Sequence, residues 1–377
     1  MTTSRFARRA GAAALTLGAL AASLTVSAPA ASAHGAAHRP PARGGHTAGS
    51  CGPRAAALGY SDALDKATYG GAKLEGLSNL AWDARSRSFV ATNDNNRTEP
   101  SRLWYLRDLA NPRIVRSPLI LRHLDGTPYN GITADNEGLA VDKRGNFIVT
   151  SELEPSIRVF GRDGVEKASL PVPDRFRVTP NGEGSVNAMF EGLTLSADGR
   201  RLTAAMEGTL SGDAPADGSF AGYRRFLVYQ RSGRDGWQPA KQLAYKVDDG
   251  MRVAEAQEYA PGKLLVLEMS WSATAGNQGK LYAVTTRGAA DVTDVANLST
   301  RPELVMSKTL VADLVTCPSM DAPLPAGAVQ ANPLLDNYEG MQVSRTRGGA
   351  YRVTLVSDDN NNATQTTRFL TLLARLP

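Results

Sequence analysis

Histidine and cysteine are nearly absent from this chain of 377 residues, which contains four of the first and two of the second. Three histidines, His34, His38 and His46, precede residue 50, so His123 is the one that remains for a folded domain. His123 stands in the phrase RHLDG, which predicts a loop, and no G-x-S-x-G nucleophile elbow occurs. A Ser-His-Asp hydrolase therefore fits poorly.

Other common signatures are also missing. The sequence has no Walker-type or dinucleotide-binding glycine-rich loop and no clear amphipathic helix. The formal net charge of +5 arises in the first 54 residues, which hold six arginines and no acid, whereas residues 55–377 carry a net charge of −1. A basic chain of this kind gives no indication of nucleic-acid binding, and we expect no nucleic-acid partner.

The N-terminus has the pattern of an export signal. Arginines including the pair Arg8-Arg9 precede an apolar stretch over residues 10–26, and Ala31-Ser32-Ala33 offers a small-residue cleavage site. Residues 1–33 are therefore predicted to be a signal peptide whose removal leaves no membrane span, and the protein is expected to be secreted. General secretion is favoured, with the twin-arginine route as the alternative.

Residues 34–54 are rich in Ala, Gly, Pro, His and Arg and lack periodic apolar positions, so they are predicted to form a flexible spacer. A metal-binding histidine tract is the alternative for this stretch. The folded domain is expected over residues 55–377. Cys51 and Cys317 are predicted to form a disulfide in the exported protein, against the alternative of two free thiols.

A repeat runs through the folded region. The phrase Glu-Gly-Leu/Met starts at Glu75, Glu137, Glu191 and Glu339, and a degraded copy, EAQE, starts at Glu255. Each copy reads as a strand, a turn and a second strand that ends in an acid, which is the pattern of a β-hairpin. Successive copies lie 62, 54, 64 and 84 residues apart.

This spacing suits four-stranded blades, and the phrases RLWYL, SIRVF, RFLVYQ and KLYAVT supply third strands. The sequence therefore predicts an all-β fold, a β-propeller of five or six blades. Six blades are preferred, because the longest interval has room for a divergent blade. The strand RFLTLLARLP is expected to pair with N-terminal residues and close the ring.

The hairpins bring acids together, because the start of the first strand and the end of the second lie at the same end of an antiparallel pair. The pairs are Glu75 with Asp94, Glu137 with Glu152, Glu191 with Glu207, Glu255 or Glu258 with Glu268, and Glu339 with Asp358. If the first strands line the central channel, these acids meet at one mouth. The alternative is that each glutamate only caps its own hairpin by accepting backbone N–H groups.

Carboxylates this close raise one another's pKa values unless a cation lies among them. Ligands that are all oxygen favour a hard cation, Ca²⁺ before Mg²⁺. Asparagines near the acids would add carbonyl oxygens, namely Asn95, Asn136, Asn187, Asn360 and Asn361. Basic side chains that could bind phosphate are Arg102, Arg158, Lys280 and Arg368, each of which has a solvated-surface role as its alternative.

Four phrases in order, DNEGLAVDKRGNFIVTSELEPSIRVF, NAMFEGLTLSADGRRLTAAMEGTL, KLLVLEMSWS and NYEGMQV followed by TLVSDDNNNATQTTRFL, resemble the phytase-like domain of the family called esterase-like activity of phytase. The likeness covers about residues 74–375. It implies a secreted or periplasmic propeller that hydrolyses esters or phosphoesters. It places the family's characteristic acids at Glu137, Glu191, Glu207, Glu268, Glu339, Asp358 and Asp359. The dense set of Lys and Arg that phytate would require is missing.

The leading hypothesis is a Ca²⁺-dependent hydrolase of phosphate or carboxylate esters, acting as a monomer on a small molecule. Glu191, Glu207 and Glu339 are the predicted catalytic residues. The predicted metal ligands are Glu75, Asp94, Glu137, Glu152, Glu268, Asp358 and Asp359. The alternatives are a non-catalytic binding propeller stabilised by Ca²⁺ and a lactonase-like propeller.

Overall fold

The computed structural model describes residues 49–94, 97–233, 236–324 and 327–377. The predicted signal peptide, residues 34–48 of the predicted spacer, and Asn95 lie outside the described residues. Residues 49–54, which were assigned to the spacer, belong to the folded unit, because β1 (Gly49–Ser50) pairs with β2 (Ala55–Ser61). In the part of the chain that is described, no helix has the length and apolar character needed to cross a membrane.

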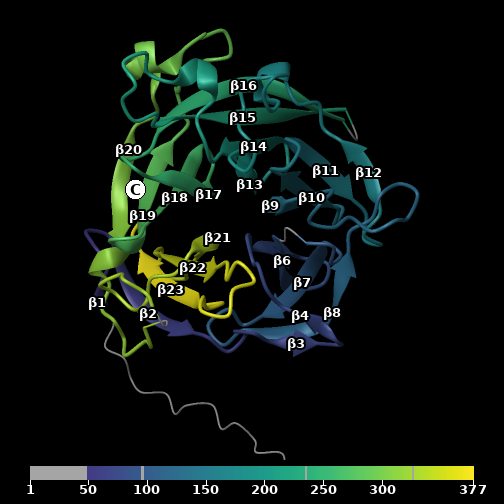
Figure 1. The fold of residues 1–377 in the computed structure, drawn as a ribbon, viewed down its shortest axis with the longest axis vertical. Coiled ribbons are helices and arrows are strands. Elements are labelled where there is room, and N and C mark those ends of the chain that lie inside the picture. The colour runs from purple at the N-terminus through teal and green to yellow at the C-terminus, as the bar shows by residue number, and fades with distance from the viewer. Residues whose placement is uncertain (1–48, 95–96, 234–235, 325–326) are drawn as a thin grey trace, which may run out of the picture. The chain divides into compact units, whose positions relative to one another are not determined.

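Twenty-three strands and five short 3₁₀ turns make up the described chain. Twenty of the strands form five blades of four antiparallel strands each, which surround a common centre (Figure 1), and β1 extends the fifth blade by a short outer strand. Blade 1 comprises β5 (Ala81–Asp83), β6 (Ser88–Thr92), β7 (Arg102–Arg107) and β8 (Arg113–Ile120). Blade 2 comprises β9 (Asn136–Val141), β10 (Phe147–Ser151), β11 (Ser156–Phe160) and β12 (Glu166–Ser169).

Blade 3 contains β13 (Phe190–Leu195), β14 (Arg201–Met206), β15 (Tyr223–Ser232) and β16 (Gly236–Lys246). Blade 4 contains β17 (Arg252–Ala260), β18 (Lys263–Ser272), β19 (Gly276–Thr285) and β20 (Lys308–Asp313). Blade 5 contains β21 (Tyr338–Arg345), β22 (Tyr351–Ser357), β23 (Phe369–Ala374) and β2. A small hairpin of β3 (Thr68–Tyr69) and β4 (Ala72–Lys73) stands apart from the blades.

The ring is closed as the sequence predicts, by pairing of β2 with β23. In Figure 1 the purple β2 lies beside the yellow β23. Next to this closure, Cys51 and Cys317 form a disulfide. The first and last strands of the domain thus share one blade.

Close approach of the innermost strands explains the glycine of the repeat. A Cβ atom on Gly138 would lie 2.7 Å from the carbonyl oxygen of Glu191 in β13, and one on Gly192 would lie 2.5 Å from the amide nitrogen of Ala256 in β17. Such distances exclude any side chain, so glycine lets each inner strand lie against the next around the channel. The apolar core is likewise divided, with one buried cluster in each of the five seams between neighbouring blades.

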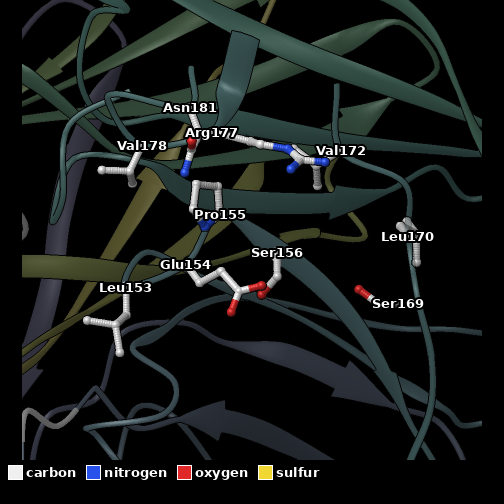
Figure 2. A pocket seen from close by; sticks show the side chains of 10 residues that line it. All are labelled: Leu153, Glu154, Pro155, Ser156, Ser169, Leu170, Val172, Arg177, Val178 and Asn181. Atoms are coloured by element: carbon white, nitrogen blue, oxygen red, sulfur yellow. The ribbon is translucent and has the colours of Figure 1, made fainter. Parts of the chain in front are cut away.

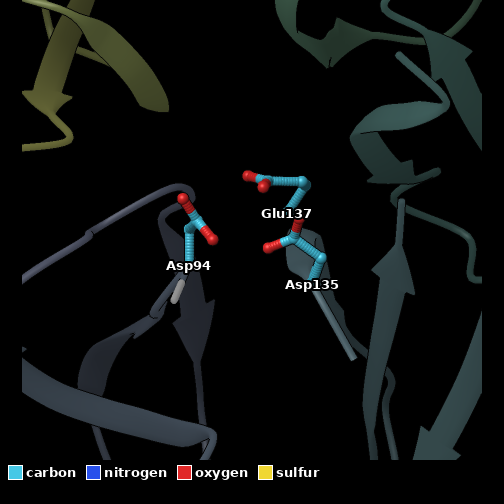
Figure 3. A group of neighbouring side chains, drawn as sticks. All are labelled: Asp94, Asp135 and Glu137. Carbon is cyan, nitrogen blue, oxygen red and sulfur yellow. The ribbon is translucent and has the colours of Figure 1, made fainter. Parts of the chain in front are cut away.

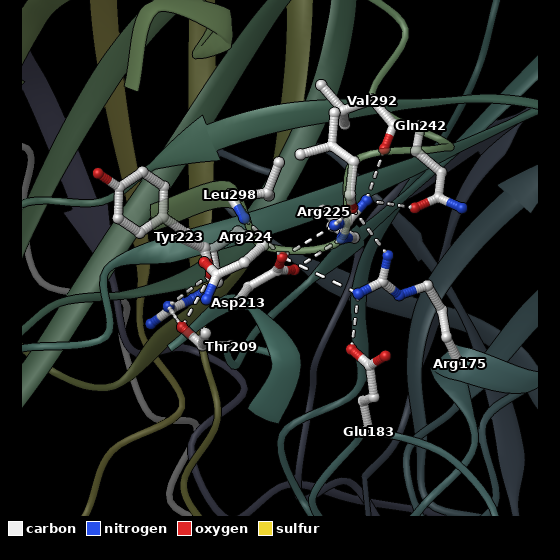
Figure 4. Close-up of polar contacts among 12 residues, drawn as sticks. Arg175, Glu183, Thr209, Asp213, Tyr223, Arg224, Arg225, Gln242, Val292 and Leu298 are labelled. Atoms are coloured by element: carbon white, nitrogen blue, oxygen red, sulfur yellow. Dashed lines mark hydrogen bonds and ion pairs between the residues drawn. The ribbon is translucent and has the colours of Figure 1, made fainter. Parts of the chain in front are cut away.

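The prediction of a propeller with five to six blades is confirmed, and the number of blades is five. The long interval before Glu339 holds irregular chain and three 3₁₀ turns, η3 (Leu298–Thr300), η4 (Pro302–Leu304) and η5 (Leu314–Thr316). The segment 286–307 is fixed to blade 3 by the buried pair of Arg225 and Asp213, whose atoms Nε and Oδ2 lie 2.6 Å apart (Figure 4). Arg225 also donates to the carbonyl groups of Val292 and Val295, at 2.8 and 2.6 Å.

Candidate functional site

Acidic side chains from several blades meet at the end of the channel where the innermost strands begin. Asp94 follows β6, Asp135 precedes β9, and Glu137 lies within β9. One carboxylate oxygen from each of the three lies within 4.8 Å of the others. Figure 3 shows these carboxylates pointing toward one another across the gap between blades 1 and 2.

A second acidic group adjoins the first and shares Glu137 with it. Oxygens of Glu137, Glu152 and Glu191 lie within 4.8 Å of one another, and all three residues are buried. Glu152 accepts a hydrogen bond of 2.6 Å from the amide of Met189. The two groups therefore form one continuous acidic site, which we call the acidic mouth: Asp94, Asp135, Glu137, Glu152 and Glu191.

Two oxygens in the acidic mouth have no partner. Oδ1 of Asp135 and Oε2 of Glu137 are buried, and neither has a hydrogen-bond partner within the described residues. Glu137 is only 7% exposed, so water cannot readily compensate. Buried carboxylate oxygens are costly without a partner, and a bound cation would satisfy both.

Burial and mutual repulsion raise the pKa values of these acids. Burial, together with the hydrogen bond and the charge of Asp135, raises the pKa of Asp94 to about 11. Burial and the nearby Glu207 raise the pKa of Glu152 to about 8. Burial and neighbouring carboxylates likewise raise the pKa values of Glu137 and Glu191. The mouth thus requires protons or a cation at neutral pH.

A single arginine connects the three predicted catalytic residues. Arg252, the first residue of β17, lies 2.9 Å from Glu191, 3.1 Å from Glu207 and 2.7 Å from Glu339, measured from guanidinium nitrogen to carboxylate oxygen. Burial alone would lower the pKa of Arg252, but Glu339, Glu207 and Glu191 more than offset it and hold the pKa above its usual value. Arg252 also donates to Asn337, at 3.0 Å.

The remaining predicted ligands divide between the mouth and other sites. Asp358 lies near Glu339, and burial and that neighbour raise the pKa of Asp358. Asp359 instead accepts from the amide of Gly76 at 3.0 Å and pairs with Lys66 at 2.5 Å. Asp359 therefore joins blade 5 to the chain before blade 1, where it has a structural role.

Glu75 and the acids of the degraded repeat do not join the acidic mouth. Glu75 receives the side-chain amide of Asn361. Glu268 is fully buried between blades 3 and 4, where it accepts from Tyr245, from the amide of Asp248 at 2.9 Å and from Lys308 at 2.6 Å. Glu255 is buried lower in the channel and accepts from Asn79.

The basic residues singled out in the sequence have other partners. Arg368 pairs with Asp62 at 2.8 Å, and Lys280 pairs with Asp248 at 2.7 Å. Arg158 lies 3.7 Å from Glu154, and Arg102 is the first residue of β7. Among the asparagines, Asn136 opens β9 with its Nδ2 buried and unpartnered, while Asn187, Asn360 and Asn361 have positive φ angles in loops.

Sequence reasoning missed Asp135 and Arg252. Asp135 stands two residues before Glu137 in the phrase ADNEGL, and Arg252 stands three residues before Glu255. Both precede a copy of the repeat, but no other copy carries the same residue type at the equivalent position. Their position just before a copy of the repeat could therefore have identified these two residues, whereas their residue types could not.

A hollow of about 400 Å³ opens at the turn that follows Glu152, and no residue of the acidic mouth lines it (Figure 2). Leu153, Glu154 and Pro155 line it, and they directly follow Glu152 in the turn between β10 and β11. Val178 and Arg177, from the chain before blade 3, line it from another side. The hollow thus offers apolar surface together with one cation, Arg177, and one carboxylate, Glu154.

Comparisons with known proteins place the chain in a family. An uncharacterized secreted protein of Arthroderma benhamiae is 27% identical over 127 residues, a match covering 27% of this chain and 25% of that protein. The chain thus matches about a quarter of that relative's length.

Among solved structures, the periplasmic gluconolactonase of Pseudomonas aeruginosa is 13% identical with a TM-score of 0.34, covering 87% of this chain and 95% of its own. The PQQ-bound aldose sugar dehydrogenase of Streptomyces coelicolor is 12% identical with a TM-score of 0.38, covering 87% of this chain and 100% of its own. The model of the phytase-like family, described as esterase-like activity of phytase, matches residues 72–361, so the chain belongs to that family.

Proposed function

We propose that the protein is an exported, cation-dependent hydrolase of phosphate or carboxylate esters whose active site is the acidic mouth. The observation that carries this proposal is the pair of buried, unpartnered oxygens on Asp135 and Glu137, which lie in a group of three converging carboxylates. An all-oxygen donor set of this kind fits Ca²⁺ better than softer metals. Asp94, Asp135 and Glu137 would hold the ion.

A bound Ca²⁺ would supply Lewis-acid polarisation of an ester or phosphoryl oxygen. The side chains then have separable tasks. Glu152, whose pKa of about 8 lies close to neutrality, is suited to exchange a proton with water. Glu191 lies between the cation group and Arg252, so its carboxylate would interact with both. Glu207 and Glu339 hold Arg252 in place.

The hollow beside Glu152 supports a substrate with an apolar portion. Its volume of about 400 Å³ suits a small acyl or alcohol group, and Leu153 and Val178 provide apolar contact. Arg177 and Glu154 both line it, and Arg177 also pairs with Asp174 at 3.0 Å, so the wall offers no excess of positive charge. We therefore expect a small-molecule ester, taken by a monomer outside the cell, in preference to a densely phosphorylated substrate.

The test is a screen of chromogenic phosphate esters, carboxylate esters and lactones with the mature protein, in Ca²⁺ and in chelator. Glu137→Gln should abolish chelator-sensitive turnover and weaken Ca²⁺ binding at least about tenfold. Glu303→Gln is the matched control, because Glu303 lies outside the acidic mouth and the hollow and its side chain is 58% exposed. Turnover that chelator leaves unchanged would contradict the mechanism, and turnover of lactones alone would indicate a lactonase.

A second candidate is a non-catalytic propeller in which the cation only stabilises the mouth. The ion pairs of Arg252 support this non-catalytic candidate, because three carboxylates are already held by this arginine next to the cation group. Here chelator would lower the melting temperature, and no ester or lactone in the screen would be cleaved.

A further inference from the structure

The face of the propeller opposite the acidic mouth is basic. It carries the turns that join the first strand of each blade to the second, from β5–β6 to β21–β22. Exposed cations in these turns and at their edges include Arg85, Arg87, Lys143, Arg200, Arg345 and Arg347. The one exposed carboxylate in these five turns, all of which are described, is Asp198. The domain is therefore polarised, with acids at one end of the channel and cations around the other.

A pocket of about 320 Å³ opens on this basic face, between blades 3 and 4. Three cations from different elements line it: Arg201 from β14, Lys241 from β16, and Arg287 from the turn after β19. Thr203 and Thr286 also line it.

The charge of the pocket is only partly compensated. Glu258 is its single acidic lining residue, and it lies 3.4 Å from Arg201. Lys241 has no hydrogen-bond or ion-pair partner among the described residues, and Arg287 donates its Nε to the carbonyl of Pro261 at 3.1 Å. Asp291 lies near Lys241 and Asp198 lies near Arg201, but neither lines the pocket. The lining itself holds three cations and one carboxylate, an excess of positive groups that favours an anion in the pocket.

The donors suit a phosphate group. Two arginines offer forked N–H pairs, lysine offers a compact charge, and the threonine hydroxyls add further donors. The cations of the neighbouring turns extend the positive surface beyond the pocket. A ligand longer than one phosphate would therefore gain contacts along the face.

We propose that this pocket binds a phosphate group of a linear polyanion, and that the basic turns bind its neighbouring phosphates. The site is separate from the acidic mouth and does not depend on the activity proposed there. A membrane surface fits less well, because the five turns carry no large apolar side chain that could enter a lipid layer. Binding in this way would hold the acidic mouth facing away from the polymer.

The test uses the full mature chain and sodium polyphosphate, with binding measured by calorimetry over a range of salt concentrations. The triple variant Arg201→Gln, Lys241→Gln, Arg287→Gln should bind at least about tenfold more weakly, and its affinity should depend less steeply on salt. Circular dichroism and thermal unfolding would establish that it folds. If it does not fold, the single variant Lys241→Gln should still bind about threefold more weakly.

The matched control removes the same charge elsewhere, with Lys73→Gln, Lys246→Gln and Arg301→Gln, three exposed cations that do not line the pocket. It should retain affinity within about twofold. Equal weakening of both triple variants would overturn the proposal, because it would indicate nonspecific attraction.

Two further probes identify the ligand chemistry. Inorganic phosphate should compete with polyphosphate for the pocket, and failure to compete would count against a phosphate site. Polygalacturonate bound as tightly as polyphosphate would overturn the choice of phosphate. Vesicles of phosphatidylglycerol that bind when polyphosphate does not would overturn the choice of a polymer.

Discussion

Arg252→Met tests whether one guanidinium stabilises the acidic mouth. The substitution keeps much of the side-chain volume but removes the charge that Glu191, Glu207 and Glu339 share at 2.7 to 3.1 Å. The three carboxylates would then repel one another without compensation. We expect the variant to fold but to be less stable in chelator at neutral pH.

The magnitude follows from the contacts. A pair of charges about 4 Å apart interacts by about 4 kcal/mol at an effective dielectric constant of about 20, and desolvation of the ions cancels part of this. Removing one partner of a buried ion pair costs about 3–5 kcal/mol. Because the side chain of Arg252 is 25% exposed, the lower value of about 3 kcal/mol is expected. The loss should shrink at pH 5, since burial raises the pKa values of Glu191 and Glu207 and both can then take up protons.

Urea unfolding in chelator at pH 5 and pH 7.5 measures both effects. Arg301→Gln is the control, because the pair of Arg301 with Glu303 is exposed on both sides and should contribute little to the free energy of unfolding. A loss for Arg252→Met no greater than that of the control, or equal losses at both pH values, would refute the reasoning. Saturating Ca²⁺ should restore part of the lost stability if the ion lies near the freed carboxylates.

Three further outcomes are expected. Without a cation, the protein should lose stability as pH rises from about 4.5 to about 8, because the Glu152 carboxyl, with its pKa raised to about 8, keeps its proton in the folded state after the unfolded chain has lost its own. Ca²⁺ should suppress this loss of stability. A chelated protein with a higher urea midpoint at pH 8 than at pH 5 would contradict the prediction. Asp213→Ala should cost about 3–5 kcal/mol by leaving the buried Arg225 unpaired, which urea unfolding would measure, and a cost under about 1 kcal/mol would show that backbone carbonyls suffice. Cys51→Ser should lower the free energy of unfolding by up to about 5 kcal/mol, because the disulfide to Cys317 closes a loop of 266 residues; an unchanged melting temperature would argue against that bond.

The fold could be predicted because its main signal repeats. Each Glu-Gly copy begins a hairpin, and the positions of β9, β13 and β21 follow directly from it. The steric need at Gly138 and Gly192 recurs at Gly340, where a Cβ atom would lie 3.1 Å from the Cα atom of Asn79 in the neighbouring blade, so the sequence records it three times. The preference for six blades failed because length alone cannot distinguish a blade from chain fixed to a neighbouring blade, as Arg225 fixes segment 286–307.

The site could be predicted only in part, because its contacts do not repeat. Glu137, Glu152 and Glu191 follow from hairpin geometry and do meet. Glu268 ends its strand in the same way, but it pairs with Val253 just before a register shift, as Met206 pairs with Phe190 and Ser357 with Tyr338. It therefore lies one residue earlier than the positions of Glu207 and Asp358. Because side chains alternate along a strand, Glu268 points into the seam between blades 3 and 4, where it meets Tyr245 and Lys308.

Closure of the ring by β2 and β23 has a consequence for biosynthesis. β2 is made first, yet its partner, Phe369–Ala374, is made after every other strand of the domain. The acidic mouth draws its side chains from blades 1 to 3, and the Arg252 cluster draws its own from blades 3 to 5. The two together need all five blades, so a nascent chain that lacks blade 5 cannot assemble the complete site. A proteolytic cut that releases β23 would reopen the same edge, which makes the C-terminal strand a point at which one cleavage would open the whole ring.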